Sequence, residues 1–375
     1  MSKKAALLTL WGSLTNYGQQ LQAFALISYL EKKGYEVTLI RYLGERRNLL
    51  INFGILFNRY ILQKKVLSTE DLCDFGTFQK RYLNYSSKEY YSYHELKKIR
   101  NDYDLFVTGS DQVWGPYLLA PGILGFPVID AYCLAFRGKG KRGISYAASF
   151  GFSKPRTCHS NRFLKRINQL DAVSVREADG VTYLKHYNID KSVLVPDPTL
   201  LFDESFYNNF VKDNISSFEK YERECFLYFV PNSSYITVDS VIESICKSIP
   251  AENIAVCATA TDVDFNSFVT PTIFEWLAYI KNSELVFTNS YHCIIFCLLF
   301  CTNFYYIPLK PKYGIQDARV SSLLKRLNIH GREIIKLEKL NNLDSLRTKK
   351  IDWAEIKSLL KAFSKIGQDF LNVNI

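Results

Sequence analysis

Apolar runs and helical patterns alternate along the first part of the chain. An apolar run at residues 5–11 leads into the polar, glycine-bearing segment 12–20, after which residues 21–34 place apolar side chains at helical spacing. A second apolar run follows at residues 35–42. Short apolar runs are typical of buried strands, so this order predicts a βαβ unit with parallel strands.

The same alternation continues through the rest of the chain. Short apolar runs predict further strands at residues 103–108, 142–147, 170–175, 193–195, 225–230, 253–257, 284–287 and 303–307. Helical patterns lie between several of these runs, among them residues 238–249 and 272–282. We therefore expect an α/β protein with two doubly wound, Rossmann-like domains that face each other across a cleft.

The alternation restarts after about residue 205, which indicates a domain boundary. We predict an N-terminal α/β domain over residues 1–204, a C-terminal α/β domain over residues 205–350, and terminal helices over residues 351–375 that pack back on the N-terminal domain. The total of 375 residues suits two domains of this kind. Residues 49–100 have a mixed pattern that predicts no single arrangement.

Composition and charge exclude several classes of protein. With 47% hydrophobic and 22% charged residues, the chain is too apolar to be disordered. Its formal net charge is +10, with basic clusters at residues 41–47, 137–142 and 154–166. No nucleic-acid-binding motif accompanies these clusters, so we expect no nucleic-acid partner. A basic surface also attracts anionic membranes and lipid diphosphates, which would explain the charge by peripheral contact with a membrane.

The cysteine and apolar patterns indicate the cellular compartment of the protein. The nine cysteines include no Cys-x-x-Cys pair and the five histidines are scattered, so we expect no metal site. An odd number of cysteines without a signal peptide fits a reducing cytoplasm. The longest apolar segment, residues 293–309, is interrupted by polar residues and falls short of the roughly 18 apolar residues of a membrane span. We expect a cytoplasmic protein, at most peripheral at the inner face of a membrane.

The segment Leu285–Phe296 is the most informative for chemistry. Its apolar start ends in a polar turn, and His292 opens the next apolar run. Ligands of open α/β sheets bind at the carboxyl ends of strands, and the backbone N–H groups at the start of a helix favour an anion. A histidine there can exchange a proton near neutral pH. The sequence also allows a plain helix cap followed by a histidine whose bonds are all satisfied.

Other polar turns also follow predicted strands. Asp111 comes after Gly109, which lets the backbone approach a ligand closely, and Arg176 offers a guanidinium suited to phosphate or carboxylate. Each has a structural alternative: Asp111 as a helix cap, and Arg176 as a surface ion pair with Glu177 or Asp179. The loop at residues 12–20 lacks the dinucleotide fingerprint, although its amides could hold an anion.

Taken together, these motifs resemble the polysaccharide pyruvyl transferase family. The segments that carry the resemblance are residues 16–18, 104–114, 145–151, 174–177, 197–201 and 288–292. They occur in the family's order, and the resemblance covers about residues 5–332. It implies a two-domain fold of the glycosyltransferase B (GT-B) type, which agrees with the two halves predicted from the apolar pattern.

The resemblance also implies an activity. Members of the family transfer the enolpyruvyl carbons of phosphoenolpyruvate to a sugar, forming a cyclic pyruvate ketal and releasing phosphate. The acceptor implied is a sugar of a capsule or exopolysaccharide precursor, often still linked to a lipid diphosphate. We place the acceptor on the N-terminal domain and the donor on the C-terminal domain. Phosphoenolpyruvate is a co-substrate here, and no other cofactor or metal is expected.

The resemblance assigns roles to individual residues. His292 would protonate the methylene carbon of the donor or assist the departing phosphate, and Asp111 would orient or deprotonate the acceptor hydroxyl. Arg176 and Arg319 would hold the anionic groups of the donor. The remaining candidates are Asn289 and Ser290 beside the donor, and Asn16, Tyr17, Gly18, Gln19, Ser110 and Gln112 along the acceptor side of the cleft.

One departure from the family pattern leaves alternatives open. Some members carry an arginine two residues before the histidine, where this chain has Ser290. Its absence would remove one charge-assisted contact to the donor, which Arg319 or another basic residue would have to replace. A GT-B glycosyltransferase that uses a nucleotide-sugar is the first alternative. A non-catalytic scaffold for polysaccharide assembly at the membrane surface is the second.

Overall fold

The computed structural model describes most of the chain. The described residues are 2–13, 16–44, 69–115, 127–151, 161–230, 236–258, 267–309 and 317–375. Parts of several sequence features lie outside these ranges, namely the loop at 12–20, the basic clusters at 41–47 and 154–166, and the mixed pattern at 49–100.

The N-terminal half contains a parallel sheet of strand order β2-β1-β3-β4. Isolated bridges from Ile144 to Ala172 and from Ala148 to Val175 join this sheet to a second parallel pair, β5 and β6. The strands are β1 (Lys3–Leu8), β2 (Tyr35–Leu39), β3 (Leu105–Thr108), β4 (Arg142–Ser145), β5 (Val173–Val175) and β6 (Ser192–Leu194). The βαβ unit predicted at the start of the chain is confirmed.

The C-terminal half contains a second parallel sheet, of strand order β10-β9-β7-β8. Its strands are β7 (Arg223–Phe229), β8 (Ile254–Ala258), β9 (Ser283–Thr288) and β10 (Asn303–Tyr306). The predicted boundary at residues 204–205 falls at the start of helix α9, between the two groups of strands.

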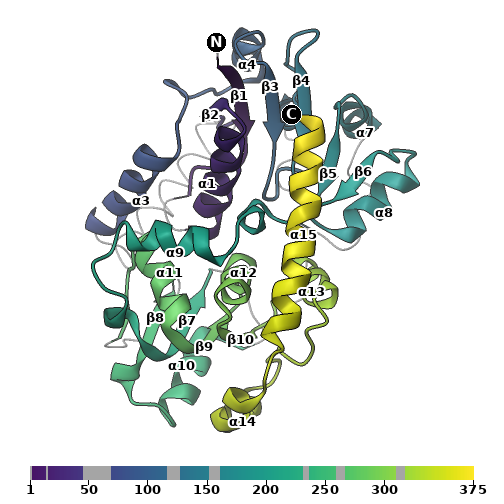
Figure 1. Ribbon diagram of the computed structural model, residues 1–375. Coiled ribbons are helices and arrows are strands. Elements are labelled where there is room, and N and C mark those ends of the chain that lie inside the picture. Colours follow the sequence, from purple (N-terminus) through teal and green to yellow (C-terminus); the bar gives the residue numbers. More distant parts are fainter. Residues whose placement is uncertain are drawn as a thin grey trace, which may run out of the picture.

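Helices surround both sheets (Figure 1). The α-helices are α1 (Tyr17–Lys32), α3 (Thr69–Tyr82), α4 (Tyr93–Leu96), α6 (Pro127–Tyr132), α7 (Asn161–Asn168), α8 (Ala178–His186), α9 (Glu204–Lys212), α10 (Val238–Cys246), α11 (Ile273–Asn282), α12 (Tyr291–Phe300), α13 (Asp317–Arg326), α14 (Leu343–Thr348) and α15 (Trp353–Asn374). Short 3₁₀ helices are η1 (Lys97–Ile99), η2 (Pro198–Leu201), η3 (Glu219–Tyr221), η4 (Ala251–Asn253) and η6 (Leu337–Asn341). Over the described ranges, no helix has the length and apolarity needed to cross a bilayer.

Both faces of each sheet are buried, as parallel sheets require. Successive residues of β1 alternate between two hydrophobic cores: Ala5 and Leu7 pack into one, and Ala6 and Leu8 into the other. Strand β7 alternates in the same way in the C-terminal half. The α/β class with helices on both sides of the sheets is therefore confirmed.

Helix α12 is buried along its whole length, which explains its apolar sequence. Its N-cap is Ser290, whose side chain accepts a hydrogen bond from the backbone N–H of Cys293. The helix ends at Cys301, which adopts a left-handed conformation with φ of 58°. A helix that is apolar on all sides has to lie in a core, and α12 packs between β9 and helix α1 of the other half.

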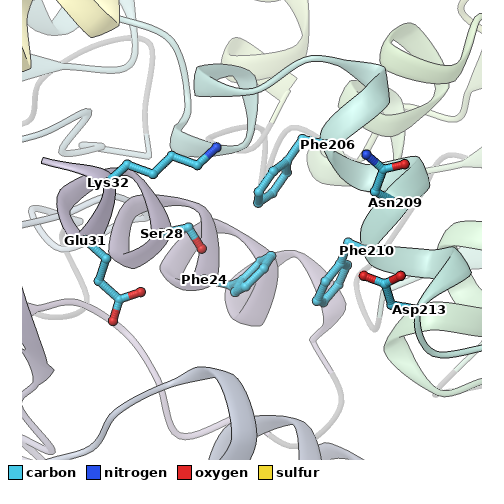
Figure 2. Close-up of a pocket in the computed structure, with 8 residues that line it drawn as sticks. All are labelled: Phe24, Ser28, Glu31, Lys32, Phe206, Asn209, Phe210 and Asp213. Atoms are coloured by element: carbon cyan, nitrogen blue, oxygen red, sulfur yellow. The ribbon is translucent and has the colours of Figure 1, made fainter.

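Aromatic side chains join the two halves around α1. The ring of Tyr17 stacks on Trp276 of α11 with centroids 5.0 Å apart, and its hydroxyl donates to the carbonyl of Pro271 at 2.7 Å. About two turns further on, Phe24 faces two phenylalanines of α9 and stacks on Phe210 at 4.5 Å (Figure 2). Aromatic pairs of this kind contribute about 0.5–1.5 kcal/mol each beyond their burial. They hold α1 against the C-terminal half.

Helix α15 connects the halves on another side. Figure 1 shows it (yellow) running from near α14 up to β4. Gln368 donates to the carbonyl of Leu201 at 2.9 Å, and Asn372 accepts a hydrogen bond from the Tyr29 hydroxyl at 3.2 Å. Residues 353–374 form one continuous helix, where the sequence pattern predicted more than one.

We predict that Gly367→Ala destabilises the protein, although alanine favours helices. A Cβ atom at Gly367 would lie 2.4 Å from the Tyr146 hydroxyl oxygen and 2.9 Å from Pro196 Cγ, so α15 would have to shift. The free energy of unfolding should fall by about 1–3 kcal/mol in a denaturant titration. Gly76→Ala in α3 is the matched control: no atom lies within 4 Å, and stability should rise by about 1 kcal/mol. A higher free energy of unfolding for both variants would contradict this packing of α15.

Candidate active site

Arg176 lies at the centre of a buried polar cluster where the strands of the N-terminal half end. It directly follows β5, and its Nη1 donates to Oδ2 of Asp197 at 2.6 Å. Its Nε lies 3.4 Å from Oε1 of Glu177. Burial alone would lower the pKa of Arg176, but the acidic groups around it, Asp197 first among them, together outweigh burial and raise the pKa. The guanidinium therefore pairs inside the protein and not at the surface.

Asp197 receives hydrogen bonds on both carboxylate oxygens. Its Oδ1 accepts from the backbone N–H of Thr199 at 3.1 Å and from the Thr199 hydroxyl at 2.8 Å. Its Oδ2 accepts from Arg176 and lies 3.4 Å from Nε2 of His292. Burial raises the pKa of Asp197, but its interactions with His292 and Arg176 together outweigh burial, so that the pKa lies below its ordinary value. Asp197 is therefore ionised at neutral pH.

A second guanidinium lies over the same tyrosine ring as the first. The Cζ atoms of Arg176 and Arg319 lie 4.8 Å and 5.5 Å from the centroid of the Tyr291 ring. With the Gln112 amide turned so that its oxygen faces Arg319, that oxygen accepts from Nη1 at 3.2 Å and from Nη2 at 3.1 Å. Burial, and then the charge of Arg176, lower the pKa of Arg319.

The two guanidinium groups keep unused donors. Nη2 of Arg176 and Nε of Arg319 are buried, and neither donates a hydrogen bond to any of the described residues. Two buried cations with free N–H groups over one aromatic ring form a site that an anion would stabilise. A carboxylate or phosphate could take hydrogen bonds from both.

His292 reaches this cluster from the C-terminal half. It is the second residue of α12 and is buried, and its Nε2–Oδ2 distance of 3.4 Å to Asp197 exceeds the usual hydrogen-bond length of about 2.9 Å. The ring packs directly on the backbone of Gly18 in the first turn of α1, where a Cβ atom would lie 2.2 Å from Nδ1. The histidine is therefore held between the two halves, next to an anion.

The turn after β3 brings Ser110 and Asp111 into the cluster. The backbone of Gly109 has φ of 102° and passes so close to Tyr146 that a Cβ atom would lie 2.3 Å from its carbonyl oxygen. The Ser110 hydroxyl donates to the carbonyl of Ala147 at 3.0 Å. Oδ1 of Asp111 lies 3.8 Å from Nη2 of Arg176, so this carboxylate faces the guanidinium.

Several predicted site residues use their polar atoms for structural bonds. The Asn289 amide accepts from the backbone N–H of Val230 at 2.8 Å and donates to its carbonyl at 3.1 Å, which joins the ends of β7 and β9. The Ser290 hydroxyl caps α12. Asn16 caps α1 by accepting from the N–H of Gln19 at 3.1 Å.

Two more of the predicted residues point away from the charges. The Tyr17 ring is part of the aromatic contact with Trp276. Oε1 of Gln19 accepts from the backbone N–H of Ser13 at 2.9 Å. The structure thus gathers Arg176, Arg319, His292, Gly18, Ser110, Asp111 and Gln112, and leaves Asn16, Tyr17, Gln19, Asn289 and Ser290 in supporting positions.

Three residues of the cluster were not among the site residues predicted from the sequence. Asp197 and Glu177 are the acidic partners of Arg176. The third is Tyr291, whose ring lies beneath both guanidinium groups. All three lie within motifs at strand ends, which was the available signal. In the part of the chain that the structure covers, no group of three or more His, Cys, Asp or Glu side chains is placed to hold a metal ion.

We predict that Gly18→Ala destabilises the protein and disturbs His292. The added Cβ would overlap the imidazole, so the ring or α1 must move, at a cost of about 1–3 kcal/mol in the free energy of unfolding. Gly12→Ala, in the segment before α1, meets no atom within 4 Å and should leave stability nearly unchanged. Thermal unfolding of the two variants checks this, and equal melting temperatures would contradict the contact between Gly18 and His292.

Asp197→Asn should show a pH-dependent loss of stability. The native pKa of Asp197 lies below its ordinary value, so its ion pairs stabilise the fold above about pH 4 and lose this effect as the pH falls further. At neutral pH we expect the variant to lose about 3–5 kcal/mol of unfolding free energy, because Arg176 stays buried without its partner. The difference from wild type should narrow below about pH 4 in denaturant titrations. The exposed Asp190→Asn is the control, and a difference independent of pH would contradict the ion pair.

The architecture resembles that of several solved proteins over nearly the whole chain. The UDP-GlcNAc 2-epimerase of Neisseria meningitidis, solved with UDP-GlcNAc, has a TM-score of 0.55 at 10% identity, and the match covers 99% of this chain and 100% of that one. The S. aureus MnaA–UDP structure gives 0.53 at 10% identity over 97% and 91% of the two chains. The glycotransferase of kitacinnamycin gives 0.53 at 11% identity over 100% and 99%. At such identities the likeness shows the fold alone, and it confirms the GT-B type.

Sequence comparison shows the family to which the chain belongs. No curated protein matches it. The family model described as polysaccharide pyruvyl transferase, however, matches residues 16–311, which include Gly18, Asp111, Arg176, Asp197 and His292 but not Arg319. The chain therefore belongs to the polysaccharide pyruvyl transferase family.

Proposed function

We propose that the protein transfers the enolpyruvyl carbons of phosphoenolpyruvate to a sugar as a cyclic ketal and releases phosphate. The observation that carries this proposal is the pair of buried guanidinium groups over Tyr291, beside His292. Phosphoenolpyruvate has a phosphate ester and a carboxylate on the same carbon, C2, and Arg176 and Arg319 each offer a free donor nitrogen. Membership of the pyruvyl transferase family agrees with this donor.

The proposed reaction needs one acid and two acceptor hydroxyl groups. His292 donates a proton to the methylene carbon of phosphoenolpyruvate, which becomes a methyl group and leaves C2 electrophilic. A sugar hydroxyl forms a bond to C2 and gives its proton to Asp111, and exchange through solvent returns a proton to His292. A second hydroxyl then bonds to C2 while the bond from C2 to the phosphate oxygen breaks, and its proton leaves with the phosphate. The products are the ketal and inorganic phosphate.

The residues around His292 suit these steps. Asp197 lies 3.4 Å from Nε2 of His292, close enough to orient the imidazole toward the donor. Asp111 faces Arg176 from the β3 turn and is the candidate to orient or deprotonate the acceptor hydroxyl. Asp197 then acts as a positioning residue, and Asp111 acts on the substrate.

In this proposal Arg319 replaces the arginine that some family members carry at the position of Ser290. Its guanidinium lies over the ring of Tyr291, which directly follows Ser290 in the chain. Among its neighbours in the described ranges, Gln112 takes two of its donors and Nε remains free. A donor with two anionic groups would complete its hydrogen bonds.

The wider setting of the activity is part of the same proposal. The acceptor would be a sugar of a capsule or exopolysaccharide precursor on a lipid diphosphate, met at the cytoplasmic face of a membrane. The net charge of +10 supports contact with such anionic groups. The reaction as written needs no metal and no cofactor besides phosphoenolpyruvate. A nucleotide-sugar glycosyltransferase shares the fold and is the alternative that the following experiment separates.

We predict that phosphoenolpyruvate binds in calorimetric titration and that Arg319→Gln weakens its affinity at least about tenfold. A hydrogen bond to a charged group contributes about 1.5–3 kcal/mol, and tenfold in affinity corresponds to about 1.4 kcal/mol. Arg326→Gln is the matched control, because Arg326 lies on the same helix but over the ring of Phe363. Its affinity should equal that of wild type. Binding of UDP-hexoses without binding of phosphoenolpyruvate would contradict the proposal.

A further inference from the structure

A cavity lies at the same edge of the N-terminal sheet as the Arg176 cluster. It follows the carboxyl ends of β1 and β2 and has a volume of about 240 Å³. We refer to it as the Trp11 cavity; its lining includes Trp11, Gly12, Ser13, Gln19, Tyr42 and Tyr132. Ligands of parallel α/β sheets bind at this edge.

Hydrogen bonds hold the walls of the Trp11 cavity in place. The amide nitrogen of Gln20 donates to the carbonyls of Trp11 at 3.2 Å and Ser13 at 2.7 Å. The indole N–H of Trp11 donates to the carbonyl of Tyr42 at 3.2 Å, which links the loop after β1 to the segment after β2. The aromatic walls are therefore positioned before any ligand enters, so binding need not order them.

The lining of the Trp11 cavity is uncharged and therefore suits a neutral ligand. Its residues are aromatic, aliphatic, glycine, serine and glutamine, and none of the described lining side chains carries a formal charge. A pyranose ring presents an apolar C–H face and a polar edge of hydroxyl groups. Aromatic rings beside amide and hydroxyl groups match both surfaces.

The size of the Trp11 cavity indicates a single ring. Its volume of about 240 Å³ lies below the roughly 300–1,000 Å³ of pockets for drug-sized ligands. A nucleotide-sugar would need more room, and it would bring phosphates into an uncharged site. One monosaccharide unit fits both the volume and the absence of charge.

The first turn of α1 connects the Trp11 cavity to the reacting groups. Gln19 lines the cavity, and Gly18 packs against the ring of His292. We propose that the Trp11 cavity binds one neutral pyranose ring of the acceptor, beside His292. The assignment of this sugar as the acceptor rests on the proposed pyruvyl transfer.

Gly12→Leu tests the cavity without disturbing its frame. A Cβ atom at Gly12 meets no atom within 4 Å, so the leucine side chain can fill the cavity without a backbone clash. Saturation-transfer NMR on the full chain would use the methyl pyranosides of galactose, glucose and mannose as probes. We expect at least one probe to bind wild type and to lose at least about tenfold in affinity in Gly12→Leu. Gly76→Leu, also in open space but on α3, should bind as wild type does.

The outcomes separate this inference from the proposed function. No binding of any probe to wild type overturns the inference, and so does equal binding to wild type and Gly12→Leu. Loss of binding in Gly76→Leu as large as in Gly12→Leu overturns it as well. Calorimetry with phosphoenolpyruvate on the same samples should give equal affinities for wild type and Gly12→Leu. Absence of phosphoenolpyruvate binding overturns the proposed donor. The binding of the pyranosides then still decides whether the Trp11 cavity is a sugar site.

Discussion

The buried ion pair between Arg176 and Asp197 is the interaction on which the site depends. Its two charges lie 2.6 Å apart and are almost completely shielded from water. Such a pair is stable only when further bonds offset the loss of hydration. Thr199 supplies them to Asp197, and Glu177 and the ring of Tyr291 supply contacts to Arg176. Because each partner is costly without the other, the pair fixes the ends of β5 and β6 relative to each other.

The same carboxylate connects the two halves of the molecule. Asp197 belongs to the N-terminal half, and the histidine beside it opens the buried helix α12 of the C-terminal half. The distance between them is set by the packing of α1 on α11 and α12, above all by the stacking of Tyr17 on Trp276 and by the close approach of Gly18 to His292. The geometry of the proposed acid therefore follows from the packing between the halves, and a rotation of one half against the other would change it.

Sequence patterns predicted the strands of the fold better than the contacts between side chains inside the site. Short apolar runs correctly indicated the strands, because a strand buried on both faces has a continuous apolar sequence. Arg176, Asp111 and His292 were found because each follows such a run. Asp197 was not selected, since its role depends on a contact with a side chain 21 positions away in the chain. Asn289 was predicted as a donor-site residue because it lies in one of the family's motifs. Its amide instead joins the ends of two strands, and this contact is visible only in the tertiary structure.

The most direct test of the account is a crystal structure of the protein with phosphoenolpyruvate. We predict density for its phosphate and carboxylate next to Nη2 of Arg176 and Nε of Arg319, over the ring of Tyr291, with the methylene carbon facing His292. Phosphoenolpyruvate bound elsewhere, with these two donors still unpaired, would contradict the assignment of the guanidinium pair as the donor site.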